Sequence, residues 1–287
     1  MDLGDHLEYV VLVHFHKSYT KRILKDNVKV ITIPYIETGG PIRFAASILT
    51  SYLLSVPILT LVALKYRINL FRSDDIIISG FPAVLASRIV RSKCIVSLLG
   101  DAEEVIAHKI GSSSNKLARC LLYATRSISR FTISHSDASI VVNRKLESIA
   151  KSYGATKVML TYPNVDLSLF VNTESEERKH NDFDVLYVGR LEPEKGPINV
   201  LKVAEILRDI NFVVAGYGSL QPEMERIIQQ KGLTNVRLLG LVDHKVLAKL
   251  YRSVDLLLLP SYSEGLPVVM LEAMACELPV VVSNVGA

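Results

Sequence analysis

The sequence predicts an α/β protein in which helices cover parallel sheets, and three observations lead to this fold class. Short β-branched runs alternate with helix-length segments along most of the 287 residues. The strand runs are continuously apolar, which is typical of parallel strands buried on both faces. A polar stretch, residues 161–183, contains Pro and Asn turn formers and separates two such series. We therefore expect two Rossmann-like domains, with ligands bound beyond the carboxyl ends of their strands.

The expected elements follow the alternation of short and long apolar segments. In the first series the pattern predicts strands at 9–15, 28–34, 75–79, 93–98, 139–143 and 157–160. In the second series it predicts strands at 184–188, 212–215, 236–239, 255–259 and 279–283, separated by helices at 197–209, 220–232, 245–253 and 266–276. These ranges give a first domain at 1–165, a linker at 166–183 and a second domain at 184–287.

Composition excludes several classes of protein. Apolar residues make up 49% and charged residues 22%, which is a globular composition and not a disordered one. The net charge of +4, without any Lys/Arg run longer than two, gives no reason to expect a nucleic-acid partner. The three cysteines, Cys94, Cys120 and Cys276, are far apart and lack a CxxC spacing, so we expect no metal, no disulfide and a reducing cytoplasm. The acidic N-terminal stretch does not resemble a secretory signal.

One uncharged segment, residues 44–64, is long enough to span a bilayer of roughly 30 Å. It contains five Ser/Thr residues and a central Pro57. Predicted strands lie on both sides of it, and a membrane span would place them on opposite sides of the bilayer. We therefore favour a buried or membrane-facing helix over a true span.

A second segment, residues 112–131, combines basic and apolar side chains without any acid. The residues concerned are Lys116, Arg119, Arg126 and Arg130, interleaved with Leu117, Leu121, Leu122 and Tyr123. This pattern is typical of a helix that lies on an anionic bilayer, and equally of a packed Rossmann helix with a solvated basic rim. Together with residues 44–64, it leads us to expect peripheral contact with the cytoplasmic face of a membrane.

The first loop of the second domain, "YVGRLEPEKGP", follows the strand predicted at 184–188. Gly189 allows a ligand to approach the backbone, and Arg190 and Lys195 lie five residues apart around a turn. Two cations at a strand end suit a diphosphate, because Arg binds oxygens with a planar fork and Lys adds a mobile point charge. The alternative is a plain surface loop in which Arg190 pairs with Glu192 or Glu194.

The second loop, "VVAGYGSL", contains Gly216 and Gly218 between a strand and a helix. The free N–H groups at the start of that helix can face a phosphate. Glycines also serve ordinary strand-to-helix turns, so this alternative stays open. The loop lacks the third glycine of a dinucleotide fingerprint, which argues against an NAD-dependent enzyme.

The third loop, "PSYSEGLP", follows the strand predicted at 255–259 and places Glu264 before a helix that carries Glu272. We expect the two carboxylates to lie on the order of 10 Å apart, since the helix rises about 1.5 Å per residue. This is wider than the ~5 Å pair of a retaining glycosidase and suits contacts at two places along an extended ligand. The alternative is a surface carboxylate at 264 and a solvated helix residue at 272.

Taken together, these loops resemble one known family. The stretches "LYVGRLEPEKG", "VVAGYGS" and "LLLPSYSEGLPVVMLEAMACELPVVVSNVGA" are similar to the donor domain of the group 1 (family 4) retaining glycosyltransferases, which have the two-domain GT-B architecture. Residues 138–170 are similar to the family's domain junction. The resemblance is strong over 130–287 and weak over 9–130.

The resemblance implies transfer of a sugar from a nucleotide-sugar donor to a glycan or lipid-linked acceptor, with retention and without a metal or cofactor. By the matching positions, Arg190 and Lys195 hold the donor diphosphate and stabilise charge on the leaving group. Glu264 contacts the hydroxyls of the donor sugar, and Glu272 binds the ribose. The other donor-binding residues lie in the same loops: Gly189, Gly216, Gly218, Gly265, Leu266, Pro267 and Val268.

The sequence departs from the family pattern in three ways. The family's first strand and Gly-rich loop are not recognisable, and Gly39-Gly40 is interpreted as an ordinary turn. Leu99 occupies the place of a family histidine, while the acceptor-side residue Asp101 is retained. The family continues beyond "SNVGA". These departures predict a chain truncated at both ends and of low stability, because the strand at 279–283 would lack covering helices.

Two functions of different classes remain open at this point. The first is a glycosyltransferase, which the two motif glutamates favour. The second is a non-catalytic module that retains nucleotide-sugar binding, which Leu99 and the missing segments favour. An epimerase or reductase lacks its nucleotide-binding fingerprint.

Overall fold

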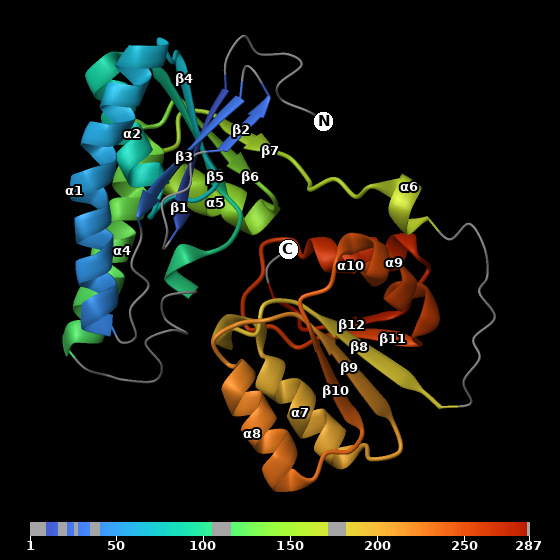
Figure 1. The fold of residues 1–287 in the computed structure, drawn as a ribbon. Coiled ribbons are helices and arrows are strands. Elements are labelled where there is room, and N and C mark those ends of the chain that lie inside the picture. Colours follow the sequence, from blue (N-terminus) through green and yellow to red (C-terminus); the bar gives the residue numbers. More distant parts are fainter. Residues whose placement is uncertain are drawn as a thin grey trace. The chain divides into compact units, whose positions relative to one another are not determined.

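The computed structural model describes residues 10–16, 22–25, 28–34, 41–104, 116–171 and 182–285 (Figure 1). The chain divides into two compact units. The first comprises 1–103, 112–141 and 147–160, and the second comprises 104–111, 142–146 and 161–287. Both units combine helices with parallel strands, so the predicted α/β class is confirmed.

Two sheets belong to the first unit. In the smaller one, β1 (Val10–His16) pairs in parallel with β3 (Val28–Pro34), and β2 (Arg22–Lys25) pairs with β3 in the antiparallel direction. The larger sheet is wholly parallel and has the order β4-β5-β6-β7. Its strands are β4 (Leu70–Ser73), β5 (Lys93–Leu98), β6 (Ala138–Val141) and β7 (Val158–Leu160).

Four helices connect these strands along the chain. They are α1 (Pro41–Tyr66), α2 (Gly80–Val90), α4 (Lys116–His135) and α5 (Arg144–Ser152). An aromatic chain links the first three helices. The ring of Phe81 in α2 lies 4.7 Å from that of Tyr52 in α1 and 5.5 Å from that of Phe131 in α4. The helices are thereby packed around α2.

One strand prediction in this unit is wrong. Residues 75–79 form a turn, and the strand lies earlier, at β4. The cause is Asp75, whose carboxylate accepts hydrogen bonds from the backbone N–H groups of Ile77 (2.8 Å), Ile78 (2.5 Å) and Ser79 (3.0 Å). A side chain that takes successive backbone donors leaves none of them for a strand partner, and the chain turns into α2 instead.

The two candidate membrane segments are both helical where the structure describes them. Residues 44–64 lie within α1, and 116–131 lie within α4, while 112–115 fall outside the described residues. Gly39-Gly40 also falls outside them. No helix in the described part of the chain combines the length and the apolarity needed to cross a bilayer.

The second unit contains a five-stranded sheet in which all strands are parallel, in the order β10-β9-β8-β11-β12. The strands are β8 (Asp184–Val188), β9 (Asn211–Ala215), β10 (Val236–Gly240), β11 (Leu256–Leu259) and β12 (Val280–Val282). The helices are α6 (Leu167–Phe170), α7 (Pro197–Ile206), α8 (Gln221–Lys231), α9 (His244–Ser253) and α10 (Val268–Ala275).

Alternate residues of each strand enter different cores. In β8, Val185 and Tyr187 pack with side chains of α7 and α8, whereas Leu186 and Val188 pack with those of α9 and α10. Figure 1 shows these two helix pairs on opposite faces of the sheet. Because both faces are covered, the inner strands β8, β9 and β11 are apolar over nearly their whole length, and this is the pattern from which the fold class was predicted.

The predicted linker at 166–183 is partly structured. Its first part forms α6, and Phe170 is buried in the core of the second unit. The carbonyl of Phe170 accepts a hydrogen bond from the Cys276 thiol at 2.8 Å. The longest segment of the second unit, 161–287, therefore includes α6, upstream of the boundary expected at 184.

Candidate functional site

The site is built from three loops at the carboxyl edge of the five-stranded sheet. Loop 1 (189–196) follows β8, loop 2 (216–220) follows β9, and loop 3 (260–267) follows β11. In the sheet, β8 lies between β9 and β11. Parallel strands end at the same edge, so loop 1 is flanked by loops 2 and 3 although loop 3 is more than sixty residues away in the sequence.

Loops 1 and 2 are joined backbone to backbone. The Gly189 N–H donates to the Ala215 carbonyl at 3.1 Å, and the Leu191 N–H donates to the Tyr217 carbonyl at 3.0 Å. A Cβ at Gly216 would lie 1.8 Å from the Gly189 carbonyl oxygen, and its φ of 147° also disfavours an L side chain. Gly216 is thus required for close packing of the two loops, whatever further role it has toward a ligand.

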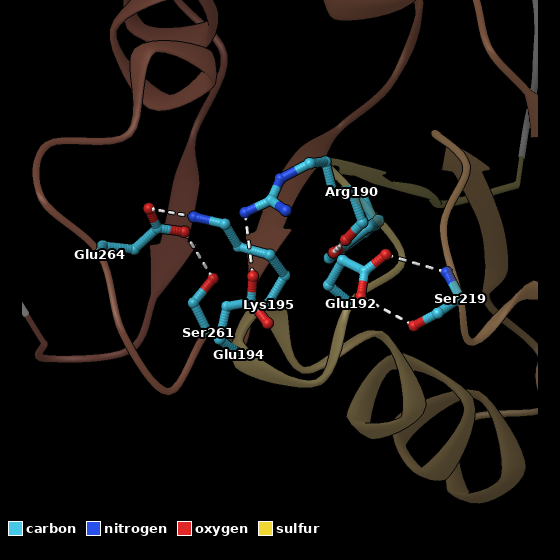
Figure 2. A network of polar contacts seen from close by, with 8 residues as sticks. Arg190, Glu192, Glu194, Lys195, Ser219, Ser261 and Glu264 are labelled. Atoms are coloured by element: carbon cyan, nitrogen blue, oxygen red, sulfur yellow. Dashed lines mark hydrogen bonds and ion pairs between the residues drawn. The ribbon is translucent and has the colours of Figure 1, made fainter. Parts of the chain in front are cut away.

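A carboxylate of loop 1 accepts a hydrogen bond from an amide of loop 2, just before α8. Glu192 accepts hydrogen bonds from the Ser219 N–H (2.9 Å) and from the Ser219 hydroxyl (2.7 Å), as Figure 2 shows. This amide therefore binds an anionic group, as helix starts commonly do, and here the anion is a side chain. The predicted phosphate contact of Gly218, next to Ser219, stays a prediction.

Loops 1 and 3 also meet through their backbones. Gly196 ends the 3-10 turn Pro193–Lys195 with a φ of 62°, and a Cβ there would lie 2.1 Å from the Pro260 carbonyl oxygen. The carbonyl of Glu194 accepts hydrogen bonds from the N–H groups of Tyr262 (2.9 Å) and Ser263 (3.3 Å). These contacts fix the position of the loop 1 side chains relative to loop 3.

The resulting approach brings Lys195 and Glu264 together. The Lys195 ammonium donates to Oε2 of Glu264 at 2.7 Å, and the Ser261 hydroxyl donates to Oε1 at 2.8 Å (Figure 2). The Lys195 side chain is 22% exposed and that of Glu264 only 11%. Charged groups held this far from water interact more strongly than an ordinary surface pair.

Arg190 pairs with Glu194 at 2.9 Å, as the surface-loop interpretation of this stretch expected. The carboxylate of Glu194 is nevertheless buried, with 2% of its side chain exposed, whereas Arg190 is 61% exposed. Arg190 is further fixed at its backbone, where its carbonyl accepts a hydrogen bond from the Tyr187 hydroxyl at 3.0 Å. A guanidinium has five N–H donors, so one bond to Glu194 leaves Arg190 able to bind an oxyanion.

Glu272 lies on α10 and is buried, which overturns the interpretation of this residue as a solvated helix side chain. Its Oε2 accepts a hydrogen bond from the Tyr251 hydroxyl at 3.0 Å, and its Oε1 lies 3.8 Å from Nδ1 of His244. Burial, and next the charge of Glu272, raise the pKa of Tyr251 far above its usual range. Tyr251 therefore stays protonated and donates to the carboxylate.

The helix expected at 266–276 begins two residues later, so Leu266 and Pro267 precede it. Gly265 and Leu266 lie in loop 3, Pro267 is the N-cap of α10, and Val268 is its first residue. Glu264 and Glu272 are thus separated by the start of one helix.

In the first unit, Asp101 accepts a hydrogen bond from the Glu103 N–H at 3.0 Å, and Leu99 is 51% exposed. An exposed leucine side chain at the position of a family histidine offers no group for proton transfer or hydrogen bonding. Among the described residues, no group of three His, Cys, Asp or Glu side chains is placed to hold a metal ion.

Three residues of this edge were not predicted as site residues: Ser261, Glu194 and Tyr251. Each is buried or nearly so, and each holds a charged side chain that was predicted. Ser261 and Glu194 lie in the same loop motifs as Glu264 and Arg190, so their closeness in sequence to these residues could have identified them. Tyr251 lies 21 residues from Glu272, and only the packing of α9 against the sheet brings them together.

Part of the chain matches a known family of proteins. Residues 171–287 match the model of the family described as glycosyl transferases group 1. A D-inositol 3-phosphate glycosyltransferase of Paenarthrobacter aurescens (strain TC1) is 34% identical over 175 residues, which is 52% of this chain and 41% of that protein. One of Mycobacterium bovis (strain BCG / Pasteur 1173P2) is 32% identical over 163 residues, 51% of this chain and 34% of that protein. The chain thus spans less than half the length of these relatives.

Solved structures resemble the whole chain in fold. Sucrose-phosphate synthase from Thermosynechococcus elongatus has a TM-score of 0.72 at 18% identity, covering 96% of this chain and 71% of that one. HepE of Anabaena, in complex with UDP and glucose, has a TM-score of 0.68 at 16% identity, covering 98% and 82%. The fold is therefore GT-B, with two Rossmann-like units. The resemblance predicted from the loops is confirmed by the family match over residues 171–287.

Proposed function

We propose that this protein is a retaining glycosyltransferase that moves a sugar from a nucleotide-sugar donor to a glycan or lipid-linked acceptor, without a metal ion. The observation that carries the proposal is the meeting of loops 1 and 3, which places Lys195 2.7 Å from Glu264 with Arg190 in the same loop. A diphosphate and the sugar attached to it are adjacent groups, and they need cations and a carboxylate at adjacent positions.

The cations serve the leaving group. When the bond between the sugar and the diphosphate breaks, negative charge develops on the phosphate oxygen. Arg190 and Lys195 are anchored by loop packing and by Glu194 and Glu264, so they are oriented before the reaction. Preorganised positive charge stabilises such a leaving group without the reorganisation that water would need.

The carboxylates serve the donor's hydroxyl groups. Glu264 accepts hydrogen bonds from the transferred sugar, and Glu272, eight residues on, accepts them from the ribose. Burial of Glu272 and its bond from Tyr251 support this role, because a buried carboxylate needs donors and ribose hydroxyls supply them. Retention and independence from metals follow the pattern of the family whose positions these residues match.

Release of nucleoside diphosphate from a panel of nucleotide sugars tests the proposal. UDP-glucose and UDP-N-acetylglucosamine are the first donors to assay, because HepE of Anabaena is solved with UDP-glucose and the pneumococcal O-GlcNAc transferase GtfA with UDP and GlcNAc. We expect one donor to give release above the background of the Glu264→Gln variant. If no donor is hydrolysed and no sugar is transferred to any acceptor tested, the assignment as a transferase fails.

A specific observation favours the second candidate, a module that binds a nucleotide sugar without transferring it. Leu99, at the place of the family's histidine, is half exposed and has no polar group to offer a sugar. Calorimetry and turnover measured on the same preparation separate the two candidates. Tight binding of a donor without release of its diphosphate would identify the module.

We place the protein at the cytoplasmic face of a membrane, and α1 supports this. Along this helix Leu53, Leu54, Leu61 and Leu64 are 50–68% exposed. Their spacing, together with exposed Pro57, puts them on one face of the helix. A continuous exposed apolar face on a soluble surface is costly unless it meets a partner or a bilayer.

Helix α4 contributes positive charge in the same unit. Arg119, Arg126 and Arg130 are exposed, and Tyr123 is among the most exposed large side chains of the described residues. Arg126 lies 3.9 Å from Glu103, which is a long contact for an ion pair. Exposed cations on α4, in the unit that also carries the apolar face of α1, favour an anionic lipid surface, and a membrane location favours a lipid-linked acceptor.

Co-sedimentation with anionic vesicles tests the membrane contact. We expect binding that fades with added salt and is lost when Lys116, Arg119, Arg126 and Arg130 become Gln. A charge-matched control replaces four exposed cations of the second unit, Arg226, Arg237, Lys245 and Lys249, and should bind as the wild type does. Absence of binding at low salt, or equal loss in both variants, would contradict the location.

A further inference from the structure

Both carboxylate oxygens of Glu264 are engaged, and the two donors differ in kind. Oε2 accepts from the Lys195 ammonium of loop 1, and Oε1 accepts from the Ser261 hydroxyl of its own loop (Figure 2). The Lys195 ammonium lies at the end of a flexible four-carbon side chain. Ser261 is 4% exposed and follows Pro260, whose carbonyl is packed against Gly196. One donor can therefore move and the other cannot.

The proposed function gives Lys195 a second acceptor. A diphosphate carries more negative charge than one carboxylate, and a lysine ammonium binds phosphate as a point charge. A diphosphate in this loop therefore competes with Glu264 for Lys195. Glu264 must nevertheless stay in place, because its carboxylate has to meet the sugar attached to that same diphosphate.

We propose that the Lys195–Glu264 pair is an exchange contact, in which the donor diphosphate takes the Lys195 ammonium while Ser261 retains the Glu264 carboxylate. Ser261 is then a positioning residue for the Glu264 carboxylate. Oε2 of Glu264, once Lys195 has left it, accepts a hydrogen bond from a hydroxyl of the donor sugar. The inference rests on the proposed function and deepens it, since it states how diphosphate binding prepares the sugar-binding carboxylate.

The opposite view is that Lys195–Glu264 is a fixed structural pair that ties loop 1 to loop 3. The two views differ in what Glu264 does to anion binding. In a fixed structural pair, loss of the Glu264 charge disorders the loops and weakens binding of an anion. In an exchange contact, loss of that charge frees Lys195 and strengthens it.

Calorimetry with inorganic pyrophosphate decides between these views without knowledge of the sugar or the base. Glu264→Gln should bind pyrophosphate about threefold to tenfold more tightly than the wild type, the range for removal of a competing, partly buried ion pair. In the Lys195→Ala background the same substitution should change affinity by less than about twofold. Equal or weaker binding by Glu264→Gln, or no binding by either protein, overturns the exchange.

Turnover tests the role of Ser261. Ser261→Ala should lower kcat by about tenfold or more, the effect of losing a hydrogen bond to a charged group, while its pyrophosphate affinity stays within about twofold of wild type. Ser261→Thr should restore most of kcat. The matched control is Ser168→Ala, which removes a serine-to-carboxylate bond (Ser168 to Asp166, 2.6 Å) outside these loops and should leave kcat unchanged. Wild-type kcat in Ser261→Ala overturns the assignment.

The failure of the proposed function is distinguishable from that of the exchange. If the wild type turns over no donor, the proposed function fails, and a crystal structure with pyrophosphate then decides the inference. The expected result is Lys195 on a phosphate oxygen with the Ser261–Glu264 hydrogen bond intact. A structure in which Lys195 remains on Glu264, or in which Glu264 has left Ser261, overturns it.

Discussion

Asp75 and Glu264 are two carboxylates in corresponding places of different units. Each follows the carboxyl end of a parallel strand, β4 in the first unit and β11 in the second. Asp75 accepts its hydrogen bonds from the backbone N–H groups of the next residues and from the Ser79 hydroxyl. Glu264 accepts from two side chains, Lys195 and Ser261, one of them on another loop.

The difference separates a structural carboxylate from one that can serve a ligand. Backbone donors cannot leave Asp75 without unfolding the turn that they define. The donors of Glu264 are side chains, and a lysine can exchange one anion for another at little cost to the fold. Charge at a strand end therefore indicates a site only when its partners are side chains that a ligand can replace. Substitutions at these carboxylates and at the side chains around them test this difference.

The largest effect is expected for Glu264→Gln. Transfer should fall by about 100-fold or more, the scale for removing one group that stabilises the reacting atoms. The melting temperature should stay close to that of the wild type, because glutamine keeps the shape and an acceptor for Ser261. Turnover and calorimetric melting, measured on one preparation, check the loss of transfer and the unchanged melting temperature. Near-normal turnover would show that Glu264 is only a loop carboxylate.

Arg190→Ala and Lys195→Ala should each weaken binding of nucleoside diphosphate by about 1.5–3 kcal/mol, the range for hydrogen bonds to charged groups. Calorimetry with UDP and GDP measures this. The control is Lys202→Ala, which removes a cation of α7 that contacts Asn199 at 3.2 Å. If both variants bind nucleoside diphosphate as tightly as the wild type, loop 1 is a plain surface loop in which Arg190 pairs with Glu194.

Asp75→Asn should reverse the pattern of Glu264→Gln. We expect the free energy of unfolding to fall by about 1–3 kcal/mol, because an amide nitrogen at the place of Oδ2 no longer accepts from the Ser79 N–H and hydroxyl. Affinity for nucleoside diphosphate should not change, since Asp75 belongs to the other unit. Denaturant unfolding of the two variants side by side measures the contrast. Equal stability of both would remove the distinction drawn between these carboxylates.

The smallest effect concerns an exposed ion pair of the first unit. Lys93 donates to Asp137 at 2.8 Å, and this hydrogen bond holds the pKa of Asp137 below its usual value. A lowered folded pKa contributes stability above the unfolded pKa of about 4, and this is lost as pH falls through the folded pKa. The stability difference between wild type and Asp137→Asn should therefore shrink below about pH 4. Melting curves across pH 2–7 check this; a gap that grows in acid would contradict the direction.

Most of the fold could be predicted because each strand carries its signal locally. In the second domain, β8 begins and ends at the predicted residues, and the other strands lie within two residues of expectation. The failure at 75–79 has a local cause that β-propensity ignores: three consecutive isoleucines read as a strand, but Asp75 takes the backbone donors. The antiparallel strand β2 was also missed, since four residues are too few for a period.

Local sequence was enough to predict the α/β class and the charged loops that contain Arg190, Lys195 and Glu264. These follow from periodicity and from motif spacing, which are properties of neighbours in the chain. Tertiary structure alone decided which groups meet: Lys195 with Glu264 across 69 residues, and Tyr251 with a buried Glu272. The physical reason is the strand order β9-β8-β11, which brings distant strand ends together and is not encoded in the period of any single segment.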